Sequence, residues 1–137
     1  MFSMRLEVLM PKPNTKSIVC ILGTGSNCTY FDGKNLINKK TKKRIKGCIP
    51  VHLLGCPADM DLINKICIDH KIEVIEDATE SLGSEYKGRM CGTLSDLGCF
   101  SFNGNKIITT GGGGAVISNN KSIAKKVFNL STIYKKL

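Results

Sequence analysis

The sequence predicts an α/β fold in which a mostly parallel sheet is flanked by helices. Residues 48–54 form an apolar run that predicts a buried strand. Pro57 and Asp59 then open a segment with helical periodicity, and residues 72–75 are β-branched and apolar, which is typical of a second strand. Strand, helix and strand in this order predict the right-handed crossover that joins two parallel strands.

The other elements are predicted from local patterns. The helix after Asp59 carries apolar residues at three- and four-residue steps, namely Met60, Ile63, Ile66 and Cys67. Further strands are predicted at residues 17–22, 98–102 and 115–118, a hairpin turn at Lys87-Gly88, and a last helix from Lys121 onward. Residues 34–46 are predicted to form a short basic helix or a loop.

Length and composition limit the class of protein. The chain has 137 residues, of which 42% are hydrophobic and 23% are charged. These values suit one domain with a modest core and exclude a disordered or fibrous protein. No apolar run approaches the roughly 20 residues of a membrane-spanning helix, and the first 13 residues lack a convincing signal peptide. We therefore expect a cytoplasmic protein without a membrane partner.

The basic charge is concentrated in one segment. The formal net charge is +9, and residues 34–46 contain seven Lys or Arg and no acid. Such a run can bind nucleic acid or an anionic surface, but it lacks the aromatic residues that stack on single strands. A solvated face or tether is favoured and no nucleic-acid partner is expected. A non-catalytic basic module that binds through residues 34–46 remains the alternative.

The cysteines predict neither a metal site nor a redox site. Seven cysteines occur at wide spacings, and no Cys-x-x-Cys pair is present. This pattern does not match zinc-binding or thioredoxin-like motifs. Most of these thiols are expected to stay reduced and to pack as small apolar groups.

Two residues carry the candidate chemistry. Asp77 directly follows the predicted strand 72–75, at the strand end where α/β sheets bind ligands. A helix N-cap is an equally good interpretation of Asp77. Lys106 follows a turn and precedes four glycines, Gly111 to Gly114, which allow close backbone approach. A partly buried lysine can act as an amine nucleophile toward an aldehyde.

The same residues lie in three segments that resemble a known family. These are Pro-Val-His-Leu-Leu-Gly at 50–55, Ile-Glu-Asp-Ala-Thr-Glu-Ser-Leu-Gly at 75–83, and residues 92–112, which include Phe-Asn-Gly-Asn-Lys. Together they resemble the DegT/StrS sugar aminotransferases, fold-type I enzymes that depend on pyridoxal 5′-phosphate (PLP). The sequences of these motifs are most similar to the branch that aminates UDP-linked 4-keto sugars of the legionaminic or perosamine type. The resemblance implies an incomplete large domain of this fold.

The resemblance also implies residue roles. Lys106 matches the lysine that bonds covalently to PLP and then transfers protons, and Asp77 matches the carboxylate that pairs with the pyridine nitrogen. Ser101 matches a serine that binds the cofactor phosphate. Glu80 matches a position beside the ring hydroxyl, where many members carry Gln. His52 lies in a matching motif, but a buried histidine with satisfied hydrogen bonds is the favoured interpretation.

The implied reaction moves an amino group in two half-reactions. The donor, expected to be glutamate, first loads the cofactor, which then aminates a nucleotide-linked keto sugar used in surface polysaccharide biosynthesis. Members of the family work as homodimers, so the resemblance implies a homodimer for the full-length protein.

The chain departs from the family at its start. Residues 1–33 are predicted to be an irregular segment that does not match, and residues 34–137 an incomplete aminotransferase domain. Upstream phosphate-binding and ring-stacking residues are not recognisable, with Gly23-Thr24 the only faint candidate for the former. We therefore expect a truncated piece that is weakly active or inactive. A fragment that does not fold stably alone is a third possibility, because a partial sheet leaves an apolar face uncovered.

Overall fold

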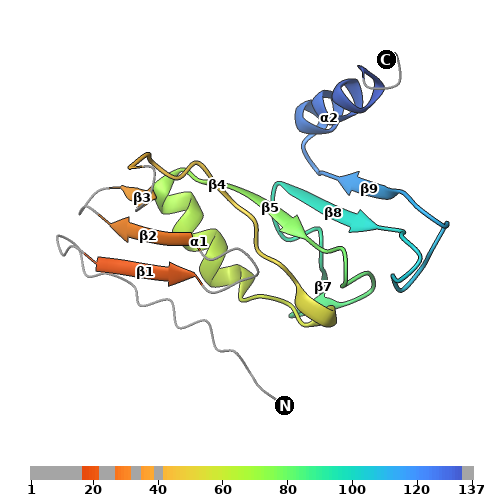
Figure 1. The fold of residues 1–137 in the computed structure, drawn as a ribbon, viewed down its shortest axis with the longest axis horizontal. Helices are drawn as coiled ribbons and strands as arrows, with labels where there is room; N and C mark the ends of the chain where they lie inside the picture. The colour runs from red at the N-terminus through yellow and green to blue at the C-terminus, as the bar shows by residue number, and fades with distance from the viewer. Residues whose placement is uncertain (1–16, 22–26, 32–34, 39–41, 134–137) are drawn as a thin grey trace. The chain divides into compact units, whose positions relative to one another are not determined.

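The chain forms two compact units, residues 1–46 and residues 47–137. The computed structural model describes residues 17–21, 27–31, 35–38 and 42–133 (Figure 1). Gly23-Thr24, the faint candidate for a phosphate-binding turn, lies outside these residues. The predicted division of the chain between residues 33 and 34 remains a prediction.

The first unit contains a three-stranded antiparallel sheet. Its strands are β1 (Ser17–Ile21), β2 (Asn27–Phe31) and β3 (Leu36–Asn38), in that order. The strand predicted at 17–22 is confirmed by β1. The helix or loop predicted for residues 34–46 is wrong at β3, because Leu36 and Ile37 pair with Phe31 and Tyr30 of β2. Backbone pairing with β2 therefore places residues 36–38 in a strand despite the basic composition of the neighbouring residues.

The second unit contains a four-stranded sheet that is mostly parallel. The strands are β4 (Gly47–Cys48), β5 (Glu73–Asp77), β8 (Leu97–Ser101) and β9 (Gly114–Ile117), in that spatial order. The first three are parallel, and β9 is antiparallel to β8 (Figure 1). The predicted α/β class, the parallel crossover and the strands near 72–75, 98–102 and 115–118 are therefore confirmed.

The predicted buried strand at 48–54 is wrong in its length and burial. Regular pairing ends at Cys48, a single bridge joins Val51 to Asp77, and a short 3-10 helix, η1 (Leu53–Gly55), follows. Ile49 is 63% exposed. Pro50 has no N–H group for a sheet ladder, although its carbonyl accepts a hydrogen bond from Asp77 N at 2.9 Å. The chain therefore follows β5 to its end without forming a regular strand.

The helix predicted after Asp59 is α1 (Met60–His70). Asp59 Oδ1 accepts a hydrogen bond from Leu62 N at 3.2 Å, which caps the first turn. Met60 and Cys67 are buried, and α1 packs against β5. The helix ends at Lys71, whose backbone is left-handed. These contacts make the core of the second unit.

A short hairpin follows β5. It consists of β6 (Glu85–Tyr86) and β7 (Arg89–Met90), and the predicted turn at Lys87-Gly88 is confirmed, since both residues have positive φ. The hairpin contacts the start of α1, because Lys87 and Arg89 both form ion pairs with Asp61.

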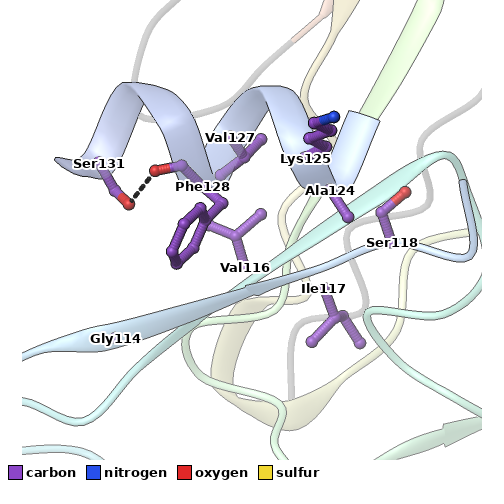
Figure 2. A pocket seen from close by; sticks show the side chains of 9 residues that line it. All are labelled: Gly114, Val116, Ile117, Ser118, Ala124, Lys125, Val127, Phe128 and Ser131. Carbon is purple, nitrogen blue, oxygen red and sulfur yellow. Dashed lines mark hydrogen bonds between the residues drawn. The ribbon is translucent and has the colours of Figure 1, made fainter. Parts of the chain in front are cut away.

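The last element is α2 (Lys121–Ile133), which begins where the sequence predicts a helix. An open hollow lies between α2 and β9, lined by apolar side chains such as Val116 and Phe128 (Figure 2). None of the predicted site residues lines this hollow. Within the described part of the chain, neither helix is long and apolar enough to span a membrane.

Candidate functional site

The candidate site lies at the carboxyl edge of the parallel strands. β5 ends at Asp77 and the neighbouring parallel strand β8 ends at Ser101. Asp77 is in register with Cys99, so Ser101 extends two residues further along the same edge. Ligands of open α/β sheets bind outside this edge. The topology therefore brings the predicted residues Asp77 and Ser101 to adjacent strand ends.

Asp77 is fixed by its main chain and by one carboxylate oxygen. Its N–H donates to Pro50 O at 2.9 Å, and its carbonyl accepts from His52 N at 3.0 Å. Its Oδ1 accepts from Thr79 N at 3.2 Å and from Thr79 Oγ1 at 2.7 Å. Among the described residues Oδ2 accepts no hydrogen bond, so this oxygen is available to a ligand.

The helix N-cap interpretation of Asp77 is wrong. The hydrogen bonds to Thr79 close a turn, and in the described part of the chain no helix begins between α1 and α2. Asp77 is instead the last residue of β5, so its carboxylate is not used to cap a helix.

Glu80 and Lys106 come together from different loops. Lys106 Nζ lies 3.7 Å from Glu80 Oε1, and the Lys106 side chain is 17% exposed. The other carboxylate oxygen of Glu80 accepts a hydrogen bond from Leu54 N at 3.0 Å. Because Glu80 follows Asp77 by three residues, this ion pair places the Lys106 amine at the carboxyl end of β5.

The loop that carries Lys106 is closed at its base. Phe102 N donates to Gly113 O at 2.9 Å, and Thr110 N donates to Phe102 O at 3.1 Å. Lys106 N donates to Asn103 O at 3.0 Å, which closes the turn predicted before the lysine. Ser101 Oγ accepts from Asn103 N at 3.4 Å, so the hydroxyl hydrogen of Ser101 remains free to donate.

A second carboxylate, Glu76, lies next to Asp77 and is fully buried. Glu76 Oε2 accepts from His52 Nε2 at 3.0 Å and from Gly92 N at 2.7 Å. Glu76 Oε1 accepts from Leu94 N at 2.6 Å and from Ser95 Oγ at 3.0 Å. Burial opposes the charge, but these hydrogen bonds from His52, Gly92, Ser95 and Leu94 together lower the pKa of Glu76.

His52 is a buried residue with both ring nitrogens bonded, as the sequence predicts. Nδ1 accepts from Ala58 N at 3.1 Å, so in the neutral ring the hydrogen is on Nε2, which donates to Glu76. Glu76 is not among the site residues predicted from the sequence. The available signal was the adjacent pair of acids at a strand end, since successive side chains alternate between sheet faces.

Comparison with known proteins identifies the family. The sequence profile of the DegT/DnrJ/EryC1/StrS aminotransferase family matches residues 27–135. The chain belongs to this family. The match begins at residue 27, within the segment of residues 1–33. PLP is the cofactor of enzymes in this family.

Three similar proteins illustrate the relationship. GDP-perosamine synthase of Escherichia coli O157:H7 is 38% identical over 85% of this chain and 35% of its own length. UDP-4-amino-4,6-dideoxy-N-acetyl-beta-L-altrosamine transaminase of Campylobacter jejuni is 47% identical over 75% of this chain and 30% of its own length. The structure of an aminotransferase from Psychrobacter cryohalolentis matches with a TM-score of 0.61 and 42% identity, over 62% of this chain and 22% of that one.

These comparisons confirm the family and the fold predicted from the sequence. The described second unit is part of the α/β large domain of PLP-dependent aminotransferases. The chain spans about a quarter to a third of the length of the first curated relatives it matches, 26% and 35%.

Proposed function

We propose that this chain carries part of the cofactor site of a PLP-dependent aminotransferase, and that the intact enzyme transfers an amino group to a nucleotide-linked keto sugar. The observation that carries the proposal is the position of the Lys106 amine, 3.7 Å from Glu80 and at the end of the strand that presents Asp77. One amine and one available carboxylate oxygen at the same sheet edge fit the two ends of the PLP ring system.

The residues present suit the group chemically. Lys106 Nζ is the only described amine placed at this edge by an ion pair to Glu80. Asp77 Oδ2 accepts no hydrogen bond from the described residues and could hold a protonated ring nitrogen. The Ser101 hydroxyl can donate to a phosphate oxygen. When bound, PLP supplies an electron-withdrawing ring that stabilises negative charge on the reacting carbon.

The side chains then have separate tasks. Lys106 anchors the cofactor. Once released from it, the Lys106 Nζ atom carries a proton to or from the reacting carbon. Asp77 keeps the ring nitrogen protonated, and Thr79 fixes the orientation of the Asp77 carboxylate. Glu80, held by Leu54 N, is proposed to lie beside the ring hydroxyl. These roles of Lys106, Asp77, Glu80 and Ser101 are proposals.

The substrate class and the partners follow from the relatives. The names of two relatives, a GDP-perosamine synthase and a UDP-linked amino sugar transaminase, support a nucleotide-linked keto sugar as the acceptor. Glutamate is the proposed donor, a homodimer the proposed assembly of the intact enzyme, and surface polysaccharide biosynthesis its proposed role. The expected cytoplasmic location remains a prediction, as does the alternative that residues 34–46 bind an anionic surface.

Covalent trapping of the cofactor tests the proposal. The 137-residue chain is mixed with PLP, reduced with borohydride and digested, and the labelled peptides are identified by mass spectrometry. We expect label on the peptide that contains Lys106 and visible absorption that Lys106→Ala abolishes. Lys121→Ala, at the exposed start of α2, is the matched control and should change neither. Label spread over the lysines of residues 34–46, with Lys106 unlabelled, would contradict the assignment.

A separate assay tests the activity of the isolated chain. We expect no turnover, or only weak turnover, of a nucleotide-linked 4-keto sugar with glutamate, because positioning of the reacting groups requires residues that this chain does not carry in recognisable form. Turnover at a rate typical of aminotransferases would disprove that expectation.

A further inference from the structure

We propose that Glu76 and His52 are positioning residues that hold the Asp77 carboxylate at the sheet edge. Neither is proposed to touch the cofactor. The role of Asp77 toward the ring nitrogen rests on the proposed function. The hold of Glu76 and His52 on the end of β5 rests on hydrogen bonds within the chain itself.

The side chains of β5 alternate between the two faces of the sheet. Glu76 and Asp77 are consecutive residues of one strand, so their side chains leave opposite faces of the sheet. The Glu76 side chain is fully buried, while Asp77 is only partly buried. A restraint on the Glu76 carboxylate therefore restrains the backbone that carries Asp77, without occupying the space in front of Asp77.

Glu76 joins the segments on both sides of β5. Its carboxylate accepts four hydrogen bonds, one from His52 on one side of β5 and three from residues 92–95. Residues 92–95 lead into β8, the strand that ends at Ser101. One carboxylate therefore ties the end of β5 to both of the segments that flank it.

His52 contacts this strand end through both its ring and its main chain. Its ring is held between Ala58 N and Glu76 Oε2, at 3.1 and 3.0 Å. Its own backbone N–H donates to Asp77 O at 3.0 Å. The ring contact thus fixes a residue whose main chain directly holds Asp77, and the Pro50 carbonyl holds the N–H of Asp77 beside it.

A carboxylate is a rare choice for a fully buried position. Burying a charge is costly, and an apolar side chain of similar volume often packs at least as well. Four donors directed at one buried carboxylate form a rigid network with a single arrangement. Such a network is expected where the position of an adjacent group matters more than stability.

Hydrogen exchange of the cofactor-free chain tests the restraint directly. Glu76→Gln removes the charge and replaces one accepting oxygen with an NH2 group, so at least one of the four donors loses its acceptor. Val74→Ala is the matched control, because Val74 is a buried residue of the same strand without a part in the network. At equal overall stability, we expect the Asp77 and His52 amides to lose about tenfold or more protection in Glu76→Gln relative to Val74→Ala, the change expected for one hydrogen bond to a charged group.

The PLP-bound chain gives a second measurement, which would not change if Glu76 and His52 only stabilised the fold. With PLP bound, we expect the pH dependence of the visible absorption to shift in Glu76→Gln and His52→Ala, in the direction in which Asp77→Asn shifts it. Val74→Ala should leave it unchanged. His52→Gln, which keeps a donor toward Glu76, should restore part of the wild-type profile relative to His52→Ala, and it serves where Glu76→Gln fails to fold.

Two results would overturn the inference. One is equal protection of the Asp77 and His52 amides in the Glu76→Gln and Val74→Ala chains. The other is an unchanged pH profile in both Glu76→Gln and His52→Ala while Asp77→Asn shifts it. If the wild-type chain takes up no PLP, the proposed function fails, and the exchange measurement alone decides whether Glu76 and His52 fix Asp77.

Discussion

Lys106 Nζ lies 3.7 Å from Glu80 Oε1, although the two residues belong to loops that follow different strands. Glu80 Oε2 is at the same time bonded to Leu54 N, at the short helix η1. One partly exposed carboxylate therefore connects three segments around the end of β5. Its charge faces the space proposed for the cofactor, which is itself an anion.

Replacing this charge is predicted to strengthen cofactor binding. In Glu80→Gln the amide oxygen can still accept from Leu54 N, but the negative charge near the anionic cofactor is gone. We expect PLP to bind several-fold more tightly, measured by titration of the visible absorption at low and high salt. Glu85→Gln, on the exposed strand β6, changes the net charge equally and is the control. The same gain in both variants would show that only net charge matters.

The buried carboxylate of Glu76 is predicted to make the fold sensitive to acid. Its pKa in the folded chain is lower than the ordinary value of 4.5, so its contribution to stability is fully present above that value and is lost as the pH falls through the folded pKa. Glu76→Gln should cost about 1–3 kcal/mol at pH 7, as expected when a buried donor loses its acceptor. The cost should shrink progressively below about pH 4.5.

Urea unfolding of both chains between pH 7 and pH 3 measures this difference. Asp61→Asn is the comparison, because Asp61 also has a lowered pKa, through hydrogen bonds and charges from Lys87 and Arg89, but is exposed. Water screens an exposed pair, so its pH-dependent effect should be the smaller one. A cost of Glu76→Gln that stays constant over this pH range would contradict the prediction.

Local signals made much of the second unit predictable. The start of α1 is determined by the Asp59 cap and by a helical apolar period, and the turn after Tyr86 by Gly88, which adopts positive φ without a steric cost. Each signal lies within a few residues of the structure it predicts. Local patterns singled out Asp77 and Lys106 as candidates, and the resemblance to a family gave them roles and added Glu80 and Ser101.

The parts that sequence reasoning missed depend on distant contacts. Residues 48–54 have the composition of a buried strand, but Pro50 interrupts the ladder and His52 is drawn to Glu76, 24 residues away. β3 forms in a basic segment because its backbone pairs with β2, which precedes it in the chain. The donors to the Glu76 carboxylate lie 16 to 24 residues away in the sequence, and hydrophobic periodicity does not predict such contacts.

Gly98 is predicted to be irreplaceable for steric reasons. A Cβ atom on Gly98 would lie 2.0 Å from Gly92 O and 2.6 Å from Gly92 Cα. Gly92 N also donates to Glu76, so displacement of Gly92 would disturb the buried network. Gly98→Ala should therefore destabilise the chain by about 3 kcal/mol or more, the upper range for an overpacked site.

Gly112→Ala is the control for this substitution. A Cβ atom there would meet nothing within 4 Å, so the change should stay within about 0.5 kcal/mol. Thermal or urea unfolding of the two variants gives the comparison. Similar stability of both alanine variants would show that β8 and residues 92–95 can separate without cost.

The thiols of Cys48 and Cys67 are predicted to differ in reactivity. The Cys67 thiol hydrogen bonds to the sulfur of Cys48, which lowers the pKa of Cys48 below the ordinary value of 9.0 although burial acts in the opposite direction. The pKa of the Cys67 thiol is raised by the same hydrogen bond and by burial. Burial and the nearby Asp77 charge raise the pKa of Cys99, which is similarly half-buried and serves as the internal reference.

Because the thiolate is the reactive form, iodoacetamide should alkylate Cys48 with a pH midpoint below 9.0 and Cys99 with a midpoint above it. Peptide mapping of the alkylated chain over a range of pH measures both midpoints at once. Cys67→Ala removes the donor and should raise the midpoint of Cys48, whereas Cys67→Ser keeps a donor and should preserve it. Coincident midpoints for Cys48 and Cys99, or a Cys48 midpoint that is indifferent to Cys67→Ala, would refute the sulfur–sulfur contact between β4 and α1.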